Sequence, residues 1–302
     1  MCFRNILIIR PGALGDTLML MPAIAQLHDE VEILLVGRYP GIDYLKPYVS
    51  QCFDYEARGW HMLFSDTFDK AGMPMVPQVD IVLGFLSDPE SRVARNLKIR
   101  FPESPIHIFP PFPPEGKNIH VALYIAQSLR KSGLPVNTEK AIDEAVKHPL
   151  IQRRSLSSKE HIVLHAGSGS EKKNYSSAFW IELIKTIKGS SSNKNTPVIL
   201  LLGPAEQNLL SYYRDNLRDF GIEFYFSPDK EKLLSILSQA SLYIGHDSGI
   251  THLAAMMGVN VIALFKESSI SQWQPLGPAV NVLQGEWEED FIGKIVKEAF
   301  SF

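Results

Sequence analysis

The chain has 302 residues, of which 45% are hydrophobic and 21% charged, with a formal net charge of −3. This is an ordinary globular composition, and at about 100–200 residues per domain the length predicts two domains. No large basic run is present, which argues against nucleic acid as a partner. The apolar run Ile6–Ile9 and all later ones are shorter than the roughly 20 residues of a membrane span, so only peripheral membrane contact is left open. Cys2 and Cys52 form no CxxC pair, and we expect a cytoplasmic protein.

The first half alternates apolar strands with amphipathic helices. We expect strands at Asn5–Arg10, Val31–Val36, Asp80–Phe85 and Ile106–Phe109. We expect helices at Asp16–His28, Gly41–Val49 and Ile119–Lys131. Residues 51–77 are aromatic and lack a clear period, and Pro110–Pro114 is typical of a rigid loop.

The same rhythm returns after a charged, serine-rich stretch at Lys147–Lys159, which we interpret as a linker. Strands are expected at His161–His165, Pro197–Leu202, Ile222–Phe226, Leu242–Ile244 and Val259–Phe265. Helices are expected at Ser177–Ile187, Glu206–Phe220, Lys230–Gln239, Gly249–Met257 and Glu288–Phe300. The tract Gly189–Asn195 is interpreted as a surface loop.

Alternating strands and helices predict a parallel sheet in each half. The expected fold is α/β, with two Rossmann-like parallel-sheet domains, 1–150 and 151–302, facing across a cleft. The last helix is free to pack back on the first domain. Ligands of such sheets bind beyond the carboxyl ends of the strands, which is where candidate residues are sought.

The turn after the first strand reads R-P-G-A-L-G-D and ends at Asp16. Gly12 and Gly15 permit a tight turn and a close approach of a ligand to the backbone. Asp16 is either a helix cap or a carboxylate that takes a proton from a sugar hydroxyl. A helix N-terminus stabilises the carboxylate anion and weakens it as a base, and proton loss concerted with bond formation would soften this objection.

A dinucleotide-binding loop is the alternative interpretation of this turn. Its glycines have a GxxG rather than a GxGxxG spacing, and no acid ends the second strand. An NADP-dependent reductase would depend on Arg38 alone, so this class of enzyme is disfavoured.

The second candidate loop, H-A-G-S-G-S-E-K-K-N-Y, begins at His165. Ser168 and Ser170 can present hydroxyls to phosphate oxygens, and Lys172 and Lys173 supply positive charge for a diphosphate leaving group. The alternative is a flexible polar loop with solvated lysines. His161 and His165 lie four apart on a strand, which is a poor spacing for a metal.

Two further strand ends carry polar residues. Glu206 follows a strand and is either a ribose ligand or an acid of a helix's first turn. In Y-I-G-H-D-S-G-I-T-H a helix begins near Ser248, and the free amides of Ser248, Gly249 and Ile250 form a candidate diphosphate-binding site. Asp247 orients the sugar or caps this helix, and His252 contacts phosphate or packs.

Absent motifs also bear on function. The chain has no D-x-D pair that would hold a metal ion against a diphosphate, and no Walker A lysine motif. We therefore expect a transferase without a metal ion or other cofactor, which relies on a helix N-terminus and a lysine.

Together these motifs resemble the ADP-heptose:lipopolysaccharide heptosyltransferase family, whose members have the GT-B fold. The resemblance runs from Ile6 to about Phe265, through I-L-I-I-R-P-G-A-L-G-D, the loop at 165–175, and G-H-D-S-G-I-T-H-L-A-A-M-M-G-V. Tyr175-Ser176 stands where the family usually has Trp-Pro, and residues 50–115 match no acceptor motif.

The resemblance implies a role for each matching residue. Asp16 matches the catalytic base, Glu206 the ribose-binding acid, and Ser168 a hydroxyl that contacts phosphate. Lys173 best matches the phosphate-contacting lysine, with Lys172 as the alternative. The sugar-diphosphate site is matched by Asp247, Ser248, Gly249 and His252.

The predicted function is inverting transfer of a heptose, or a related sugar, from an ADP-sugar to a hydroxyl of a saccharide or lipid-linked saccharide. Lipopolysaccharide core or surface glycan assembly, at the cytoplasmic face of the inner membrane, follows by analogy. The alternatives are a sugar-nucleotide epimerase and a non-catalytic sugar-nucleotide-binding protein.

Overall fold

The computed structural model describes residues 3–57, 59–153, 161–190, 195–288 and 290–301. The chain forms two compact units, Met1–Glu144 and Ala145–Phe302, which are described separately. Parts of the expected linker at Lys147–Lys159 and of the expected loop at Gly189–Asn195 lie outside the described residues.

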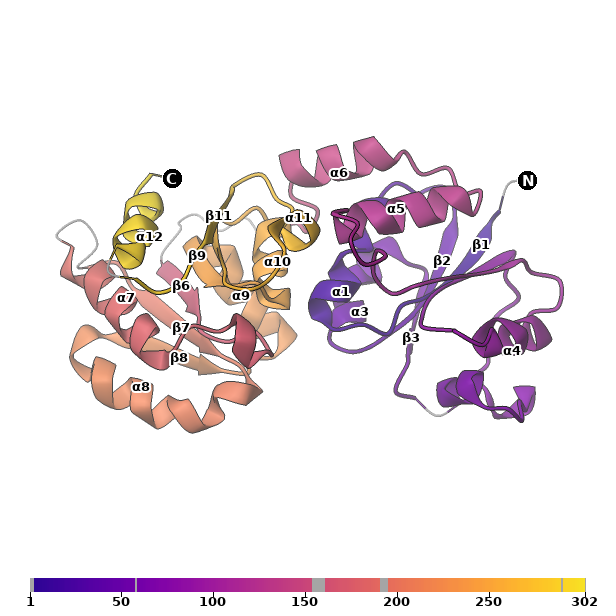
Figure 1. Ribbon diagram of the computed structural model, residues 1–302, viewed down its shortest axis with the longest axis horizontal. Helices are drawn as coiled ribbons and strands as arrows, with labels where there is room; N and C mark the ends of the chain where they lie inside the picture. Colours follow the sequence, from indigo (N-terminus) through magenta and orange to yellow (C-terminus); the bar gives the residue numbers. More distant parts are fainter. Residues whose placement is uncertain (1–2, 58, 154–160, 191–194, 289, 302) are drawn as a thin grey trace. The chain divides into compact units, whose positions relative to one another are not determined.

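The first unit is built on a five-stranded sheet with the order β3-β2-β1-β4-β5, in which every pairing is parallel (Figure 1). Its strands are β1 (Asn5–Ile9), β2 (Glu32–Gly37), β3 (Gln51–Asp54), β4 (Ile81–Phe85) and β5 (Ile106–Phe109). Residues Ile6–Ile9 of the central strand are completely buried, as expected for a strand covered on both faces. The short edge strand β3 was not predicted, since its side chains are only partly buried and show no clear pattern.

The helices of the first unit are α1 (Leu14–Leu18), α2 (Met21–Ile24), α3 (Gly41–Leu45), α4 (Arg92–Arg100) and α5 (Val121–Lys131), and α6 (Thr138–Lys147) runs across the boundary into the second unit. The single helix predicted over Asp16–His28 is wrong, because the chain forms α1 and α2 instead. Pro22 lies in the first turn of α2, where its missing N–H leaves no hydrogen bond unmade. The sequence analysis also missed α4 and α6.

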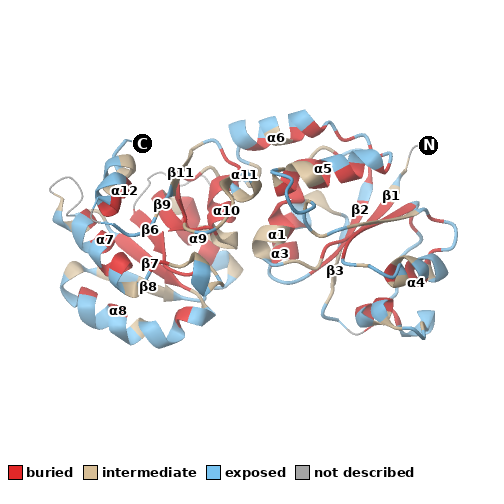
Figure 2. Ribbon diagram, viewed as in Figure 1, coloured by how far each residue is buried: buried red, intermediate tan, exposed pale blue. Residues whose placement is uncertain are grey.

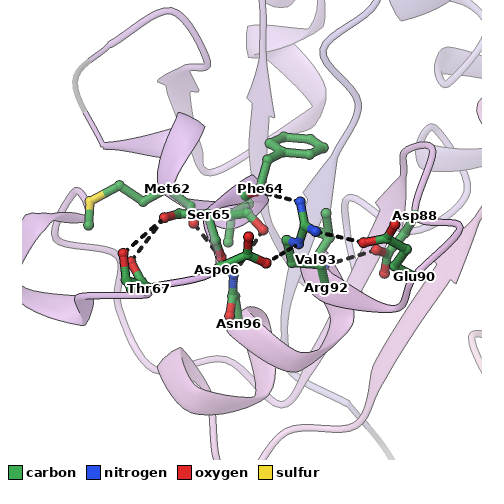
Figure 3. Close-up of polar contacts among 11 residues, drawn as sticks. Met62, Phe64, Ser65, Asp66, Thr67, Asp88, Glu90, Arg92, Val93 and Asn96 are labelled. Atoms are coloured by element: carbon green, nitrogen blue, oxygen red, sulfur yellow. Dashed lines mark hydrogen bonds and ion pairs between the residues drawn. The ribbon is translucent and has the colours of Figure 1, made fainter.

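The irregular segment after β3 contains two short 3₁₀ turns, Trp60–Phe64 and Lys70–Gly72. It is held against α4 by Asn96, which is 1% exposed. The side-chain amide of Asn96 donates to the carbonyl oxygens of Leu63 at 3.0 Å and Ser65 at 2.9 Å (Figure 3). The hydrogen bonds of a buried amide thus fix the backbone of this segment, which lacks the regular spacing of hydrophobic residues seen in the helices and strands.

The second unit has a six-stranded sheet with the order β11-β10-β9-β6-β7-β8, again parallel at every pairing. The strands are β6 (His161–His165), β7 (Val198–Leu202), β8 (Ile222–Phe226), β9 (Ala240–His246), β10 (Val261–Phe265) and β11 (Val280–Gln284). All were predicted to within two residues at each end except β11, which was missed. β11 is an edge strand whose residues are only partly buried or exposed.

The helices of this unit are α7 (Ser177–Gly189), α8 (Leu210–Leu217), α9 (Lys230–Gln239), α10 (Gly249–Met256), α11 (Ile270–Trp273) and α12 (Phe291–Ala299). Short 3₁₀ turns occur at Glu171–Lys173, Pro204–Leu209 and Arg218–Phe220. The buried residues of α7, α8 and α12 form one core with side chains of β6, β7, β9 and β10. The last helix α12 packs against α7 within its own unit.

In both units the central strands are the most continuously buried segments, and helices cover them (Figure 2). This arrangement confirms the predicted α/β class with two Rossmann-like parallel sheets. No helix among residues 3–57, 59–153, 161–190, 195–288 and 290–301 is long and apolar enough to span a membrane.

Replacing Asn96 with alanine should lower the free energy of unfolding by about 2–4 kcal/mol, because it leaves the buried carbonyls of Leu63 and Ser65 without a donor. Urea unfolding followed by circular dichroism measures the loss. Arg92 on the same helix is the control, since its carboxylate partners Asp66 and Glu90 are 78% and 71% exposed and its hydrogen bond to the carbonyl of Phe64, at 3.2 Å, is also exposed. Arg92→Ala should cost less than about 1 kcal/mol. Equal losses in the two variants would contradict the role given to Asn96.

Candidate functional site

Three polar loops of the second unit emerge at one edge of its sheet. They follow β6, β7 and β9, which are neighbours in the order β9-β6-β7 and run parallel. Their carboxyl ends therefore bring together the loops 166–174, 203–206 and 247–248. This edge is where ligands bind in open α/β sheets.

The centre of this site is an ion pair between the loops after β6 and β9. Lys173 Nζ lies 2.6 Å from Oδ2 of Asp247, whose side chain is only 3% exposed. His252 Nε2 lies 3.6 Å from the other carboxylate oxygen. Burial by itself raises the pKa of Asp247, but the neighbouring His252 and Lys173 outweigh it and lower this pKa to about 2. Asp247 is therefore a permanent buried anion that holds Lys173 in place.

The two lysines of the loop after β6 have different surroundings. Lys173 is partly buried, and its ammonium group lies 5.9 Å from the centre of the Trp273 ring. Lys172 is exposed. Lys173 is the lysine that contacts Asp247, and which of the two lysines contacts phosphate stays a prediction.

The helix α10 begins at this site with free amides. Ser248 is its N-cap, and its hydroxyl accepts from the amide of Thr251 at 3.4 Å. The amides of Gly249 and Ile250 have no acceptor in the part of the chain that the structure describes. The first amides of a helix carry a partial positive charge and bind anions. The loop after β6 therefore brings an ammonium group to the sheet edge where the loop after β9 presents two open amides.

Ser168 and Glu206 shape the loops around the ion pair. Ser168 Oγ donates to Asn174 Oδ1 at 2.6 Å and so holds its own loop together, while its contact with phosphate stays a prediction. Glu206 is 5% exposed, and its Oε2 accepts from the amide of Gly203 at 2.9 Å. A Cβ at Gly167 would collide with the carboxylate of Glu206, so this glycine lets the two loops meet.

Tyr175, where the resembling family usually has tryptophan, occupies a buried aromatic cluster. Its ring stacks on Phe179 with centroids 4.4 Å apart, and its hydroxyl donates to the carbonyl of Gly285. Its amide donates to His246 Nε2 at 2.8 Å. Tyrosine therefore preserves the packing of an aromatic residue and adds a hydrogen bond to the loop after β11. Sequence reasoning gave no role to His246, although it lies within the G-H-D-S-G motif, and it missed Trp273, which no motif contains.

His165 and His246, two buried histidines of this edge, are neutral at physiological pH. Burial lowers the pKa of His165 to about 4 and that of His246 to about 3. His161 lies at the other end of β6, where its ring contacts the carbonyl of Ile236 at 2.8 Å. Among the described residues there is no group of three or more His, Cys, Asp or Glu side chains that could hold a metal ion.

Asp16 belongs to the first unit, beyond the carboxyl end of β1. It is the third residue of α1, and its Oδ2 accepts from the amide of Ala13 at 2.9 Å. The carboxylate folds back over Gly12, where a Cβ would collide with it. Asp16 therefore has the cap contact that the sequence allowed, while Oδ1 has no partner among the residues described and remains open to a ligand.

A cavity of about 490 Å³ lies in the same unit beyond the carboxyl ends of β4 and β5, and we name it the β4–β5 pocket. It is lined by Leu86, Ser87, Asp88, Pro89, Ser91, Ala94, Ile108, Phe109, Pro110 and Pro111. Both oxygens of Asp88 are engaged by the amides of Val93 and Ala94 at the start of α4. The pocket and Asp16 share one sheet edge, since β1 and β4 are neighbours.

A model of glycosyltransferase family 9 (heptosyltransferase) matches residues 114–291. No curated protein matches the sequence.

Similar solved structures include a family 9 glycosyl transferase from Veillonella parvula, with 15% identity over 99% of this chain and 96% of that one and a TM-score of 0.73. Another is E. coli heptosyltransferase WaaC with ADP, with 14% identity over 98% and 99% and a TM-score of 0.70. A UDP-GlcNAc 2-epimerase from Methanocaldococcus jannaschii is more distant, with 13% identity over 98% and 92% and a TM-score of 0.52. At these identities the structures show a shared fold, which is the GT-B fold that the sequence predicted.

The family model covers more than half of the chain and includes the loops with Ser168, Lys173, Glu206 and Asp247. The chain therefore belongs to glycosyltransferase family 9, the heptosyltransferase family, and it is a glycosyltransferase with the GT-B fold.

Proposed function

We propose that this enzyme transfers a heptose, or a related sugar, from an ADP-sugar to a hydroxyl of a saccharide or lipid-linked saccharide. Transfer occurs with inversion and without a metal ion, in the assembly of lipopolysaccharide core or a surface glycan. Membership of family 9 supports the sugar, and the E. coli relative solved with ADP and with ADP-2-deoxy-2-fluoro heptose supports the nucleotide. The observation that carries the proposal is the ammonium of Lys173, held by Asp247 next to the open amides of α10.

The donor binds to the second unit in this proposal. Its diphosphate accepts hydrogen bonds from the amides of Gly249 and Ile250 and from Lys173. When the bond between the sugar and the diphosphate breaks, negative charge grows on the departing oxygen, and these donors stabilise it without a metal ion. Glu206 binds the ribose, and Ser168 keeps the phosphate loop in shape. Asp247 and His252 lie beside the sugar.

Asp16 of the first unit acts as the base. The acceptor hydroxyl attacks the anomeric carbon from the face opposite the diphosphate and loses its proton to Asp16. A glycosidic bond forms, the bond to the diphosphate breaks, and ADP leaves. The open Oδ1 of Asp16 supports this role, because its hydrogen bond to Ala13 engages only Oδ2.

We place the acceptor sugar in the β4–β5 pocket. A sugar ring has hydroxyls at its edge and an apolar face. The pocket offers Ser87 and Ser91 together with the apolar surfaces of Phe109 and Pro110. Its position at the sheet edge that carries Asp16 is consistent with delivery of a hydroxyl to that carboxylate.

The cytoplasmic location, with the acceptor reached at the inner face of the inner membrane, is part of the same proposal. The epimerase alternative has only a more distant structural likeness in its favour. An epimerase would convert the donor without an acceptor, so product analysis with donor alone separates the two. Arg38, on which a reductase would depend, pairs with Glu56 at 2.5 Å.

Substitution of Lys173 by alanine should weaken ADP binding about 10-fold or more, because a charge-assisted hydrogen bond to phosphate is lost. The matched variant Lys172→Ala should change the dissociation constant less than about twofold, since this lysine is exposed and makes no contact with Asp247. Isothermal titration calorimetry with ADP measures both. A larger effect at Lys172 would show that the wrong lysine has been assigned.

Loss of the carboxylate at residue 16 should reduce kcat by roughly 100-fold or more while leaving ADP affinity nearly unchanged, which is the scale of general-base loss. Asp16→Ala and Asp16→Asn are compared in a transfer assay. Asparagine keeps an oxygen that can accept from Ala13 N but cannot take a proton. Normal turnover of the asparagine variant would show that Asp16 is not the base and only caps the helix.

Filling the pocket should raise the KM for the acceptor about 10-fold or more in Ala94→Phe, with ADP affinity unchanged. A core oligosaccharide released from lipopolysaccharide and lacking heptose is the acceptor in this assay. The control is Ile99→Phe on the same helix, at a side chain that is 49% exposed and outside the pocket. Equal KM values in the two variants would place the acceptor elsewhere.

A further inference from the structure

Arg10 is a buried cation that the proposed reaction does not yet use. It directly follows β1, donates its backbone amide to the carbonyl of Val36 at 2.9 Å, and is 2% exposed. No carboxylate pairs with it at ion-pair distance in the described part of the chain. Burial lowers the pKa of its guanidinium to about 10, against the opposing effect of Asp16. The charge is thus kept in the interior without a direct counter-ion.

The contacts of Arg10 join two distant parts of the first unit. Nε donates to the backbone carbonyl of Asp16 at 2.7 Å. Nη1 donates to the carbonyl of Pro111, 101 residues along the chain, at 2.9 Å. The guanidinium also lies 5.3 Å from the ring centre of Phe85 and 5.9 Å from that of Phe112. One side chain therefore bridges the turn that carries the base and a wall of the β4–β5 pocket.

Folding energetics do not account for an arginine at this position. Its third nitrogen, Nη2, is buried and has no hydrogen-bond partner within the described residues. A buried charge with incomplete hydrogen bonding loses more solvation free energy than an apolar side chain of similar length. The arginine is therefore better explained by what its two hydrogen bonds hold in place.

Within the residues that the structure describes, no other side chain hydrogen-bonds both the turn of Asp16 and the pocket wall. The bond from Ala13 N to Asp16 Oδ2 stays within the turn, and α1 is only five residues long. The wall itself has a second support, because Tyr124 Oη donates to the carbonyl of Pro110 at 2.9 Å. Tyr124 reaches the wall from α5 without touching the turn, which makes it a natural control.

We propose that Arg10 is a positioning residue that sets the distance between the Asp16 carboxylate and the acceptor sugar in the β4–β5 pocket, through its two carbonyl contacts. The inference rests on the proposed function, in which Asp16 is the base and the pocket holds the acceptor. A misplacement of about 1 Å between base and reacting hydroxyl is enough to lower turnover by about 100-fold. Substrate binding by the second unit does not depend on this bridge.

The test is a double-mutant cycle with Arg10→Met and Asp16→Asn, read by kcat. Arg10→Met should lower kcat about 10- to 100-fold, with the dissociation constant for ADP unchanged within about twofold. In the Asp16→Asn background the same change should have less than about a twofold effect, because Arg10 acts through Asp16. The melting temperature of Arg10→Met should fall by no more than about 3 °C, since methionine fills the space without a buried charge and the carbonyls that lose a donor belong to the partly exposed residues Asp16 and Pro111.

Two further variants separate the bridge from the charge. Arg10→Lys keeps the charge but cannot donate along two directions of a planar fork, so its kcat should stay within about threefold of Arg10→Met. Tyr124→Phe removes one hydrogen bond from the same wall and should change kcat less than about threefold. Wild-type turnover in Arg10→Lys would contradict the proposal that the two hydrogen bonds of Arg10, rather than its charge, position Asp16.

The inference and the function it rests on fail in different ways. Normal turnover of Asp16→Asn would remove the base itself. Normal turnover of Arg10→Met, or an undiminished effect of that change in the Asp16→Asn background, would overturn only the role of Arg10.

Discussion

Parallel pairing of β9, β6 and β7 is the constraint on which the donor site depends. Because the three strands are adjacent and point the same way, segments separated by as many as 74 residues end at one edge, where Lys173 meets Asp247. The ion pair between these two side chains then fixes the loops in contact with each other. The ion pair keeps a cation close to the open amides of α10, so positive potential is in place before any ligand arrives.

The ion pair also explains how the site tolerates a buried carboxylate. Asp247 cannot easily be protonated, since its pKa is held near 2, and it would be costly to bury without a partner. Lys173 and His252 provide that partner. Lys173 remains partly exposed, so it can contact an incoming diphosphate without leaving Asp247. The first unit solves a related problem differently, because there a buried cation, Arg10, is surrounded by carbonyls and aromatic rings.

Sequence reasoning worked where a single physical signal dominates. Continuous apolar runs predicted the central strands, and the glycine-rich turns predicted where the loops carrying Asp16 and Asp247 would lie. It failed where order comes from tertiary contacts. β3 and β11 are edge strands with partly exposed side chains, and the helix expected over Asp16–His28 is interrupted near Pro22. The bridge made by Arg10 depends on Pro111, 101 residues away, and no local pattern contains it.

The space left by the missing side chain of Gly167 has a consequence for how such enzymes diversify. The carboxylate of Glu206 occupies that space, so the loop after β6 and the loop after β7 are sterically complementary. Neither can be exchanged for the loop of a relative by itself without a steric clash or an empty gap. A recombination event that changes nucleotide preference would therefore have to exchange the loop with Gly167 and the loop with Glu206 together.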